Sequence, residues 1–199
     1  MWLLLACRPD PGAPDYPEPS ALGRDSDSDF LSGTTPYEEG DTRLSIGIFY
    51  EGGASQWIDV DNVSQHFYIY EASFTVATSD ERVEGYTSDE IVVARDTWWG
   101  GGVHWDDPRD LSAYTTMHVA LMSEDNAALE IAMQAGGDEG KLAASDYGFV
   151  ADGAWHDVVI PLEDFGLSLS AVDVPLVLVG EAWDSGSSFH IDDLYLDDR

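Results

Sequence analysis

The chain has 199 residues, 44% of them hydrophobic, and its 39 acidic and 8 basic side chains give a formal net charge of −31. A polyanion of this kind repels phosphate backbones and anionic lipid headgroups, so the composition argues against nucleic-acid binding and against direct adsorption to a membrane. A single cysteine, Cys7, excludes a disulfide framework and a cysteine-based zinc cluster.

The acidity itself has two explanations that the composition leaves open. The acids are spread along the whole chain, and Asp outnumbers Glu by 26 to 13. A solvated surface suited to salty water explains this spread, since salt screens the repulsion between like charges. Calcium binding is the second explanation, because Ca²⁺ takes hard oxygen ligands, and both can hold in one protein.

Residues 1–7 (MWLLLAC) form a short apolar segment that ends in the cysteine. They are too short for a complete signal peptide and lack its basic start. Leu4-Leu5-Ala6-Cys7 resembles the lipobox of bacterial lipoproteins, in which the cysteine is lipidated and becomes the mature N-terminus. The resemblance implies a truncated signal peptide at 1–7, a lipid on Cys7, and a location in the cell envelope or outside the cell. The alternative is a cytosolic protein whose N-terminus is apolar by chance.

Residues 8–42 are predicted to be an extended, disordered spacer. Five of the nine prolines fall within the first twenty residues, and acids are interspersed among them. The segment DSDSD at 25–29 begins like an EF-hand loop, but Phe30 and Pro36 stand where that loop needs glycine and glutamate. The globular domain is therefore expected to occupy residues 43–199.

From Arg43 onward, short β-prone segments alternate with turn signals, and no segment sustains a long helical period. Residues 114–123 alternate most clearly, with Met117, Val119 and Leu121 on one face and His118, Ala120 and Met122 on the other. The predicted strands are 44–50, 66–78, 90–94, 114–123, 129–135, 155–162, 174–180 and 188–196. Several of them have two apolar faces, so the fold class is expected to be all-β, an antiparallel β-sandwich of jelly-roll type.

Residues 96–107 read DTWWGGGVHWDD, in which three tryptophans flank three consecutive glycines. A glycine run weakens a strand, so we expect a bulge or a close strand approach that lets one indole turn inward. Trp99 is assigned to this inward role. Trp98 and Trp105 are expected to remain free to face a ligand.

Five motifs between residues 44 and 197 together resemble carbohydrate-binding modules with the galactose-binding-like jelly roll. In chain order they are FYEG at 49–52 with Trp57 after it, WGGG at 99–102, DLSAY at 110–114, GAWHDVVIPLEDF at 153–165, and FHIDDLYL at 189–196. The first motif departs from the family's F-E-x-G pattern, and residues 54–74 are hard to align. The resemblance is more specific for the fold than for any ligand, because one fold hosts many functions.

The resemblance also implies a structural Ca²⁺ that ties the first strand to the last. The matching ligands are Glu51 and Asp193, with Asp192 as the alternate. Two side chains with backbone carbonyls and water suit an ion that takes six to eight oxygens. The alternative is that Asp192 and Asp193 are acids at the end of a strand on a charged surface.

A glycan partner requires flat aromatic faces that stack on sugar rings and planar polar groups that bind hydroxyls. Such residues are expected near loops and strand ends, or on the central strands, from which His118, Glu130 and Gln134 are expected to project onto one concave face. The candidate ligand-binding residues are Trp98, Trp105, Tyr86, Trp183, His118, Glu130 and Gln134. Any single indole in a β-sandwich is more often part of the core, and this is the role expected for Trp57 and Trp155.

Catalysis is not expected, because the sequence has none of the common nucleophile, zinc-hydrolase or phosphate-loop motifs. The sequence therefore predicts a non-catalytic protein that binds a polysaccharide or glycan, is tethered to the cell envelope or secreted, and is stabilised by Ca²⁺. The alternative is a structural or interaction protein of the envelope or of an extracellular assembly, which uses the same sandwich to bind protein partners.

Overall fold

The computed structural model describes residues 43–45, 57–60, 63–83, 88–94, 98–125, 128–181 and 186–198. Side chains are described from Tyr68 onward, except at position 78. The strands are β1 (Arg43–Ser45), β2 (Trp57–Val60), β3 (Val63–Ile69), β4 (Phe74–Ser79), β5 (Ser88–Val93), β6 (Trp98–Trp105), β7 (Thr116–Met122), β8 (Leu129–Ala135), β9 (Asp138–Ala143), β10 (His156–Pro161), β11 (Val172–Glu181) and β12 (Ser188–Asp197). Short 3₁₀ turns lie at η3 (Tyr70–Ala72), η4 (Ala144–Tyr147), η5 (Leu162–Phe165) and η6 (Leu169–Ala171).

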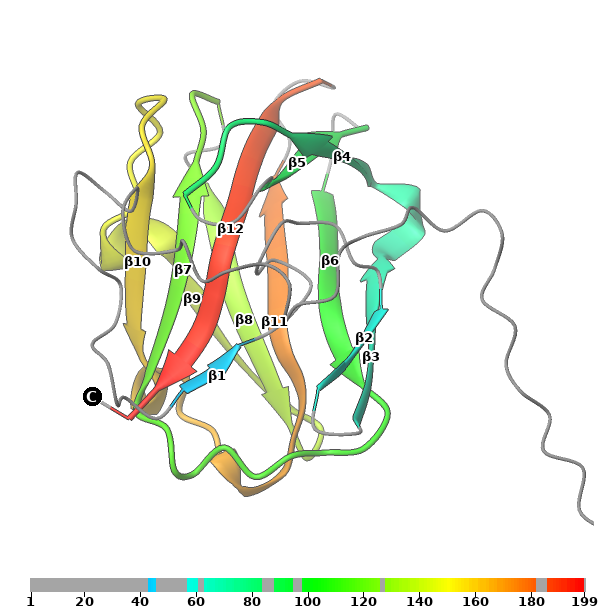
Figure 1. The fold of residues 1–199 in the computed structure, drawn as a ribbon, viewed down its shortest axis with the longest axis vertical. Coiled ribbons are helices and arrows are strands. Elements are labelled where there is room, and N and C mark those ends of the chain that lie inside the picture. The colour runs from blue at the N-terminus through cyan, green and yellow to red at the C-terminus, as the bar shows by residue number, and fades with distance from the viewer. Residues whose placement is uncertain are drawn as a thin grey trace, which may run out of the picture.

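These strands form two antiparallel sheets, which confirms the all-β sandwich. The β12 sheet has the order β10-β7-β12-β5-β4, and β1 also pairs with β12. The β11 sheet has the order β2-β3-β6-β11-β8-β9. The two sheets lie face to face in Figure 1, with β12 in the front layer and β11 in the layer behind it. No helix of the described residues is long and apolar enough to cross a membrane.

The core lies between the sheets and is built by strand alternation. On β7, Met117, Val119 and Leu121 are fully buried in the main apolar cluster, as the sequence predicts. Ile131 and Met133 of β8 enter the same cluster from the opposite sheet. Because successive side chains of a strand point to opposite faces, the residues between them lie on the outer faces of the sandwich.

The predicted single strand at 66–78 is wrong: these residues form two strands in different sheets. β3 belongs to the β11 sheet and β4 to the β12 sheet. The turn η3 joins them, with Glu71 at φ 54° and Ala72 at φ 51°. Because residues other than glycine rarely adopt positive φ, the aromatic and β-branched composition of this segment gave no turn signal. The strands β2 and β9 were also missed, because their sequences WIDV and DEGKLA alternate weakly.

A bulge interrupts β12 near its middle. Its pairing with β7 gains one residue between Asp192 and Tyr195, and Asp193 has φ 47° there. Both Asp192 and Asp193 are buried. The bulge therefore places two adjacent carboxylates inside the protein, in the C-terminal strand.

Candidate ligand-binding face

The strand β6 carries the sequence WWGGGVHW and divides its side chains between the core and the outer face of the β11 sheet. Trp99 and Val103 are fully buried in the core, and Trp105 is only 5% exposed. Trp98 is 43% exposed and lies on the outer face. Trp99 therefore takes the inward role predicted for it.

The expected exposure of Trp105 is wrong, and strand register gives the reason. β6 pairs with β11 without a shift, from Trp98 opposite Glu181 to Val103 opposite Leu176. No bulge forms at the glycines, so Trp105, six residues after Trp99, points to the same side as Trp99. Its ring instead packs in the core, with the Arg109 guanidinium 5.1 Å from the ring centroid.

The glycines of β6 allow aromatic rings to pack directly against the backbone on both faces of the sheet. A Cβ on Gly100 would lie 2.8 Å from Cζ2 of Trp98, so the exposed indole lies directly over this glycine. A Cβ on Gly101 would lie 2.5 Å from Cζ of Phe74, which packs over that glycine from the core side. The glycine run is therefore required for two aromatic rings to lie against the backbone on opposite faces.

The aromatic end of the outer face joins β6 to the end of β3 and to η3. Tyr70 stacks parallel to Trp98, with ring centroids 6.3 Å apart and an interplanar angle of 4°. The Tyr70 hydroxyl is hydrogen-bonded to Nε2 of His104 at 2.8 Å. Tyr68, which is 51% exposed, meets His104 edge-on at 5.0 Å. These four residues form an aromatic platform, the name used below for Tyr68, Tyr70, Trp98 and His104.

The polar end of the same face lies on β8 and β9. Nζ of Lys141 is 3.6 Å from Oε2 of Glu130 and 3.8 Å from Oε1 of Glu139. The side-chain amide of Gln134 donates a hydrogen bond of 2.8 Å to Oε2 of Glu139. These four residues form a polar array, the name used below for Glu130, Gln134, Glu139 and Lys141. The array offers both donors and acceptors to a ligand.

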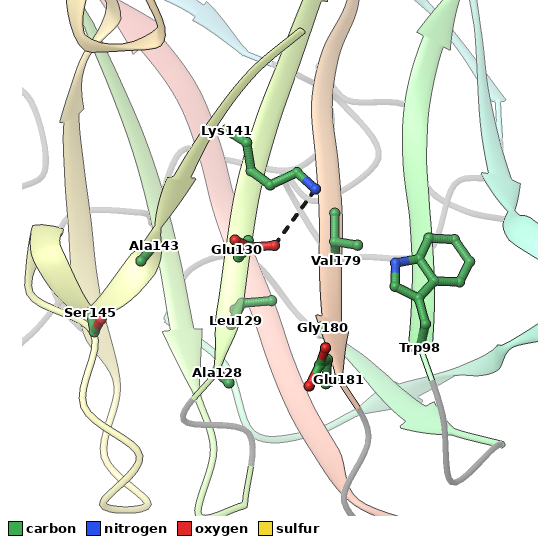
Figure 2. A pocket seen from close by; sticks show the side chains of 10 residues that line it. All are labelled: Trp98, Ala128, Leu129, Glu130, Lys141, Ala143, Ser145, Val179, Gly180 and Glu181. Atoms are coloured by element: carbon green, nitrogen blue, oxygen red, sulfur yellow. Dashed lines mark ion pairs between the residues drawn. The ribbon is translucent and has the colours of Figure 1, made fainter.

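A groove connects the two ends. It has a volume of about 640 Å³ and is lined by Trp98, Ala128, Leu129, Glu130, Lys141, Ala143, Ser145, Val179, Gly180 and Glu181. In Figure 2, Trp98 lies at one side on β6, the Lys141–Glu130 ion pair lies at the other on β8 and β9, and Val179 of β11 lies between them. Ala132, Val177 and Val179 form a small apolar cluster in this middle part, and Tyr70 packs against it.

The two ends of the face also interact electrostatically. The pKa of the Tyr70 hydroxyl is raised above its usual value of 10.0, first by burial and second by the negative charge of Glu139. Both effects disfavour the phenolate. The field of Glu139 therefore extends from the polar array to the aromatic platform.

The structure brings together three of the predicted ligand-binding residues and places a fourth elsewhere. Trp98, Glu130 and Gln134 lie on the outer face of the β11 sheet. His118 lies on β7 in the other sheet, stacked on Tyr195 at 4.6 Å, with its ring nitrogens 3.5 Å and 3.4 Å from carboxylate oxygens of Asp157 and Asp197. The prediction that His118 shares a face with Glu130 and Gln134 is therefore wrong, since β7 and β8 belong to different sheets.

The remaining predicted residues divide into those the structure describes and those it does not. Tyr86, Trp183, Glu51 and Cys7 lie outside the described residues, and the side chain of Trp57 is not described. Trp155 is half-buried and packs against Val83 and Ala120, apart from the main core. The core role expected for Trp155 therefore holds only in this smaller cluster.

The predicted calcium ligands on β12 are described, and their surroundings differ. Asp192 accepts backbone N–H bonds from Val83 at 2.8 Å and from Asp193 at 2.9 Å. Asp193 is buried at its left-handed position in the bulge. Over the described part of the chain, no group of three or more His, Cys, Asp or Glu side chains is placed to hold a metal. A calcium ion at this place would therefore need backbone carbonyls, water or Glu51 to complete its oxygen ligands.

Sequence reasoning missed most of the aromatic and polar residues of the face: Tyr68, Tyr70, His104, Glu139, Lys141 and Glu181. Two signals were present. Tyr68 and Tyr70 are two residues apart, and Lys141 is the only lysine of a chain with 39 acids. Both were overlooked because the turn at η3 and the strand β9 were not predicted.

Comparisons with known proteins identify the fold. The sequence matches no protein-family profile, and no curated protein matches it in sequence. A family 11 carbohydrate-binding module of Clostridium thermocellum, in complex with a β-1,3-1,4-mixed-linked tetrasaccharide, superposes with a TM-score of 0.55 at 15% identity over 77% of this chain and 94% of its own.

Two further solved structures agree. A family 30 carbohydrate-binding module gives a TM-score of 0.56 at 15% identity, over 78% of this chain and 98% of its own. The family 11 module of a cellulosomal cellulase of C. thermocellum gives 0.52 at 16% identity, over 80% of this chain and 95% of its own. The globular part of this chain therefore has the jelly-roll fold of the carbohydrate-binding modules.

Proposed function

We propose that this protein binds a polysaccharide or glycan on the outer face of the β11 sheet and does not alter it chemically. The observation that carries the proposal is the groove of about 640 Å³ in which the exposed Trp98 indole faces the Lys141–Glu130 ion pair. This volume is in the range of small-molecule sites.

The two ends of the face offer the two interactions that hold a sugar. The Trp98 indole presents a flat apolar surface for the C–H face of a pyranose ring, and Tyr70 fixes its orientation by stacking parallel to it. The polar array offers a lysine ammonium as donor and two carboxylates as acceptors for hydroxyl groups. A sugar chain lying across the strands meets both sets at once.

The dimensions of the face favour an oligosaccharide over a single sugar. The strands β6, β11, β8 and β9 are consecutive neighbours, so three strand spacings of about 4.8 Å separate the two ends, roughly 14 Å in all. This distance exceeds the width of one pyranose ring. The complex of the family 11 module with a mixed-linked tetrasaccharide makes β-glucan oligosaccharides the first ligands to test.

A structural calcium ion is part of the proposal. Asp193 would hold it, because a buried carboxylate in a strand bulge is stabilised by a bound cation. Asp192 would contribute less, since both of its oxygens already accept backbone N–H bonds. Bound there, the ion would neutralise the bulge and fix β12 at the centre of its sheet.

The proposal also includes attachment to the cell surface. The lipobox-like sequence ending at Cys7 and the proline-rich segment after it support a lipid anchor followed by a spacer. The experiment is mass spectrometry of the protein purified from its native membrane. A diacylated Cys7 at the N-terminus is the expected result, and an unmodified Met1 would contradict the anchor.

Glycan binding is tested by calorimetric titration of the purified protein with a panel of soluble oligosaccharides that starts with β-glucans. Trp98→Ala should weaken binding about tenfold or more, since truncated aromatic hot spots cost 2 kcal/mol or more. Trp155→Ala changes a tryptophan that packs against Ala120 of the other sheet; it is the matched control and should leave affinity unchanged. No binding across the panel would refute the proposed function, and release of new reducing ends would refute its non-catalytic part.

A further inference from the structure

The charges at the groove are unbalanced. Glu130 and Glu181 line it, Glu139 lies beside it, and Lys141 is the one cation among the described residues that line it. Nζ of Lys141 lies within 3.6 Å and 3.8 Å of two separate carboxylates, those of Glu130 and Glu139. The groove therefore holds three acids against one base, and that base is shared by two of them, Glu130 and Glu139.

The negative potential of this arrangement extends along the face. Glu139 contributes to the raised pKa of Tyr70, which belongs to the aromatic platform. The whole chain carries a formal charge of −31, which adds a long-range field of the same sign. A ligand on this face thus meets negative charge at one end and the electron-rich faces of aromatic rings at the other.

We propose that Glu130 and Glu139 make the groove selective by charge, so that it accepts uncharged glycans and rejects glycans that carry carboxylates. This inference rests on the proposed function. A hydroxyl group can accept from Nζ of Lys141 and donate to either glutamate, so both glutamates serve an uncharged sugar. A uronate carboxylate that approaches Lys141 lies against the same two glutamates, which repel it and offer it no proton.

The test compares the affinities for a neutral and an anionic oligosaccharide of equal length, a mixed-linked β-glucan oligosaccharide and an oligogalacturonide. The proteins are the wild type, the double variant Glu130→Gln/Glu139→Gln, and the control Glu81→Gln/Glu163→Gln. Both double variants remove two negative charges from exposed positions, but Glu81 and Glu163 lie outside the groove. The measured quantity is the ratio of the two dissociation constants, that of the anionic ligand over that of the neutral one. A hydrogen bond that a variant loses with both ligands weakens both affinities alike and therefore cancels in this ratio.

The wild type should bind the neutral ligand and show a ratio well above one. The groove variant frees Lys141 and should lower this ratio on the order of tenfold or more, while the control leaves it nearly unchanged. At about 1 M salt, where the Debye length is about 3 Å, the wild-type ratio should shrink.

Three outcomes would overturn the inference. Equal wild-type affinity for both ligands refutes charge selection while leaving the proposed function intact. An equal fall of the ratio in the control assigns selectivity to the total charge instead of to Glu130 and Glu139. Binding of neither ligand, nor of any other oligosaccharide of the panel, by any of the three proteins and with folding confirmed by thermal melts, removes the glycan site and the inference with it.

Discussion

Gly100 and Gly101, which are adjacent in β6, should differ in how much stability they lose when each is replaced by alanine. In Gly101→Ala the new Cβ lies 2.5 Å from Cζ of Phe74 and 2.7 Å from the backbone oxygen of Tyr68. Ordinary contacts are near 3.5–4.0 Å. Phe74 is 2% exposed and the carbonyl belongs to a neighbouring strand, so neither yields easily.

The expected cost of Gly101→Ala is about 2 kcal/mol of folding free energy. Overpacking a core costs about 1–3 kcal/mol, or more when backbone must move, and the smaller conformational freedom of alanine in the unfolded chain returns up to about 1 kcal/mol. For a domain of this size the melting temperature should fall by about 4–8 °C. The measurement is chemical denaturation together with a thermal melt.

In Gly100→Ala the new Cβ meets the Trp98 indole at 2.8 Å and the backbone oxygen of Leu178 at 3.3 Å. Trp98 is 43% exposed and can swing away, so stability should change by no more than about 1 kcal/mol. The displaced indole no longer stacks on Tyr70, and glycan affinity should fall. If Gly100→Ala proves the more destabilising of the two, or if Gly101→Ala folds as stably as the wild type, the assignment of these glycines to opposite faces is refuted.

Three further predictions concern single groups. Trp99→Ala should lower the free energy of unfolding by about 3–5 kcal/mol, because the indole is fully buried, whereas Trp98→Ala should lower it by less than about 1 kcal/mol. Denaturation curves measure both losses, and a larger loss for Trp98→Ala than for Trp99→Ala would contradict the prediction. Glu139→Gln removes a negative charge that disfavours the phenolate of Tyr70, so the pKa of Tyr70 should fall but stay above its usual value because burial remains. The pKa is measured by phenolate absorbance, and Tyr70→Phe identifies which signal belongs to Tyr70. An unchanged pKa would contradict the prediction. Millimolar Ca²⁺ should raise the melting temperature as ligand mass action requires, and Asp193→Asn should abolish the rise; a wild type that does not respond would remove the calcium site.

Strand alternation was the part of the fold that the sequence could predict. Met117, Val119 and Leu121 alternate with polar or smaller residues, and all three are in the core. The same rule, applied across the glycines of β6, would have placed Trp105 with Trp99. The prediction for Trp105 is wrong because it expects a bulge at the glycines, where the register is continuous.

Positions that depend on tertiary contacts could not be predicted in this way. Nothing in HFYIYEASF signals that Glu71 and Ala72 adopt positive φ and send the chain from one sheet to the other. That turn places Tyr70 beside Trp98, and the pairing of β9 with β8 places Lys141 beside Glu130. Half of the candidate face therefore depends on strand order, which a single sequence does not contain.

The claim that a glycan occupies the outer face of the β11 sheet is tested most directly by the indole N–H signals of the tryptophans in two-dimensional ¹H–¹⁵N NMR. Trp98 and Trp99 are neighbours in sequence on opposite sides of one strand, and Trp155 belongs to the other sheet's outer surface. Titration with a mixed-linked β-glucan oligosaccharide should shift the Trp98 signal strongly and leave those of Trp99 and Trp155 nearly in place. A glycan that shifts Trp155 while Trp98 stays unmoved would place the binding site on the opposite sheet and contradict the claim.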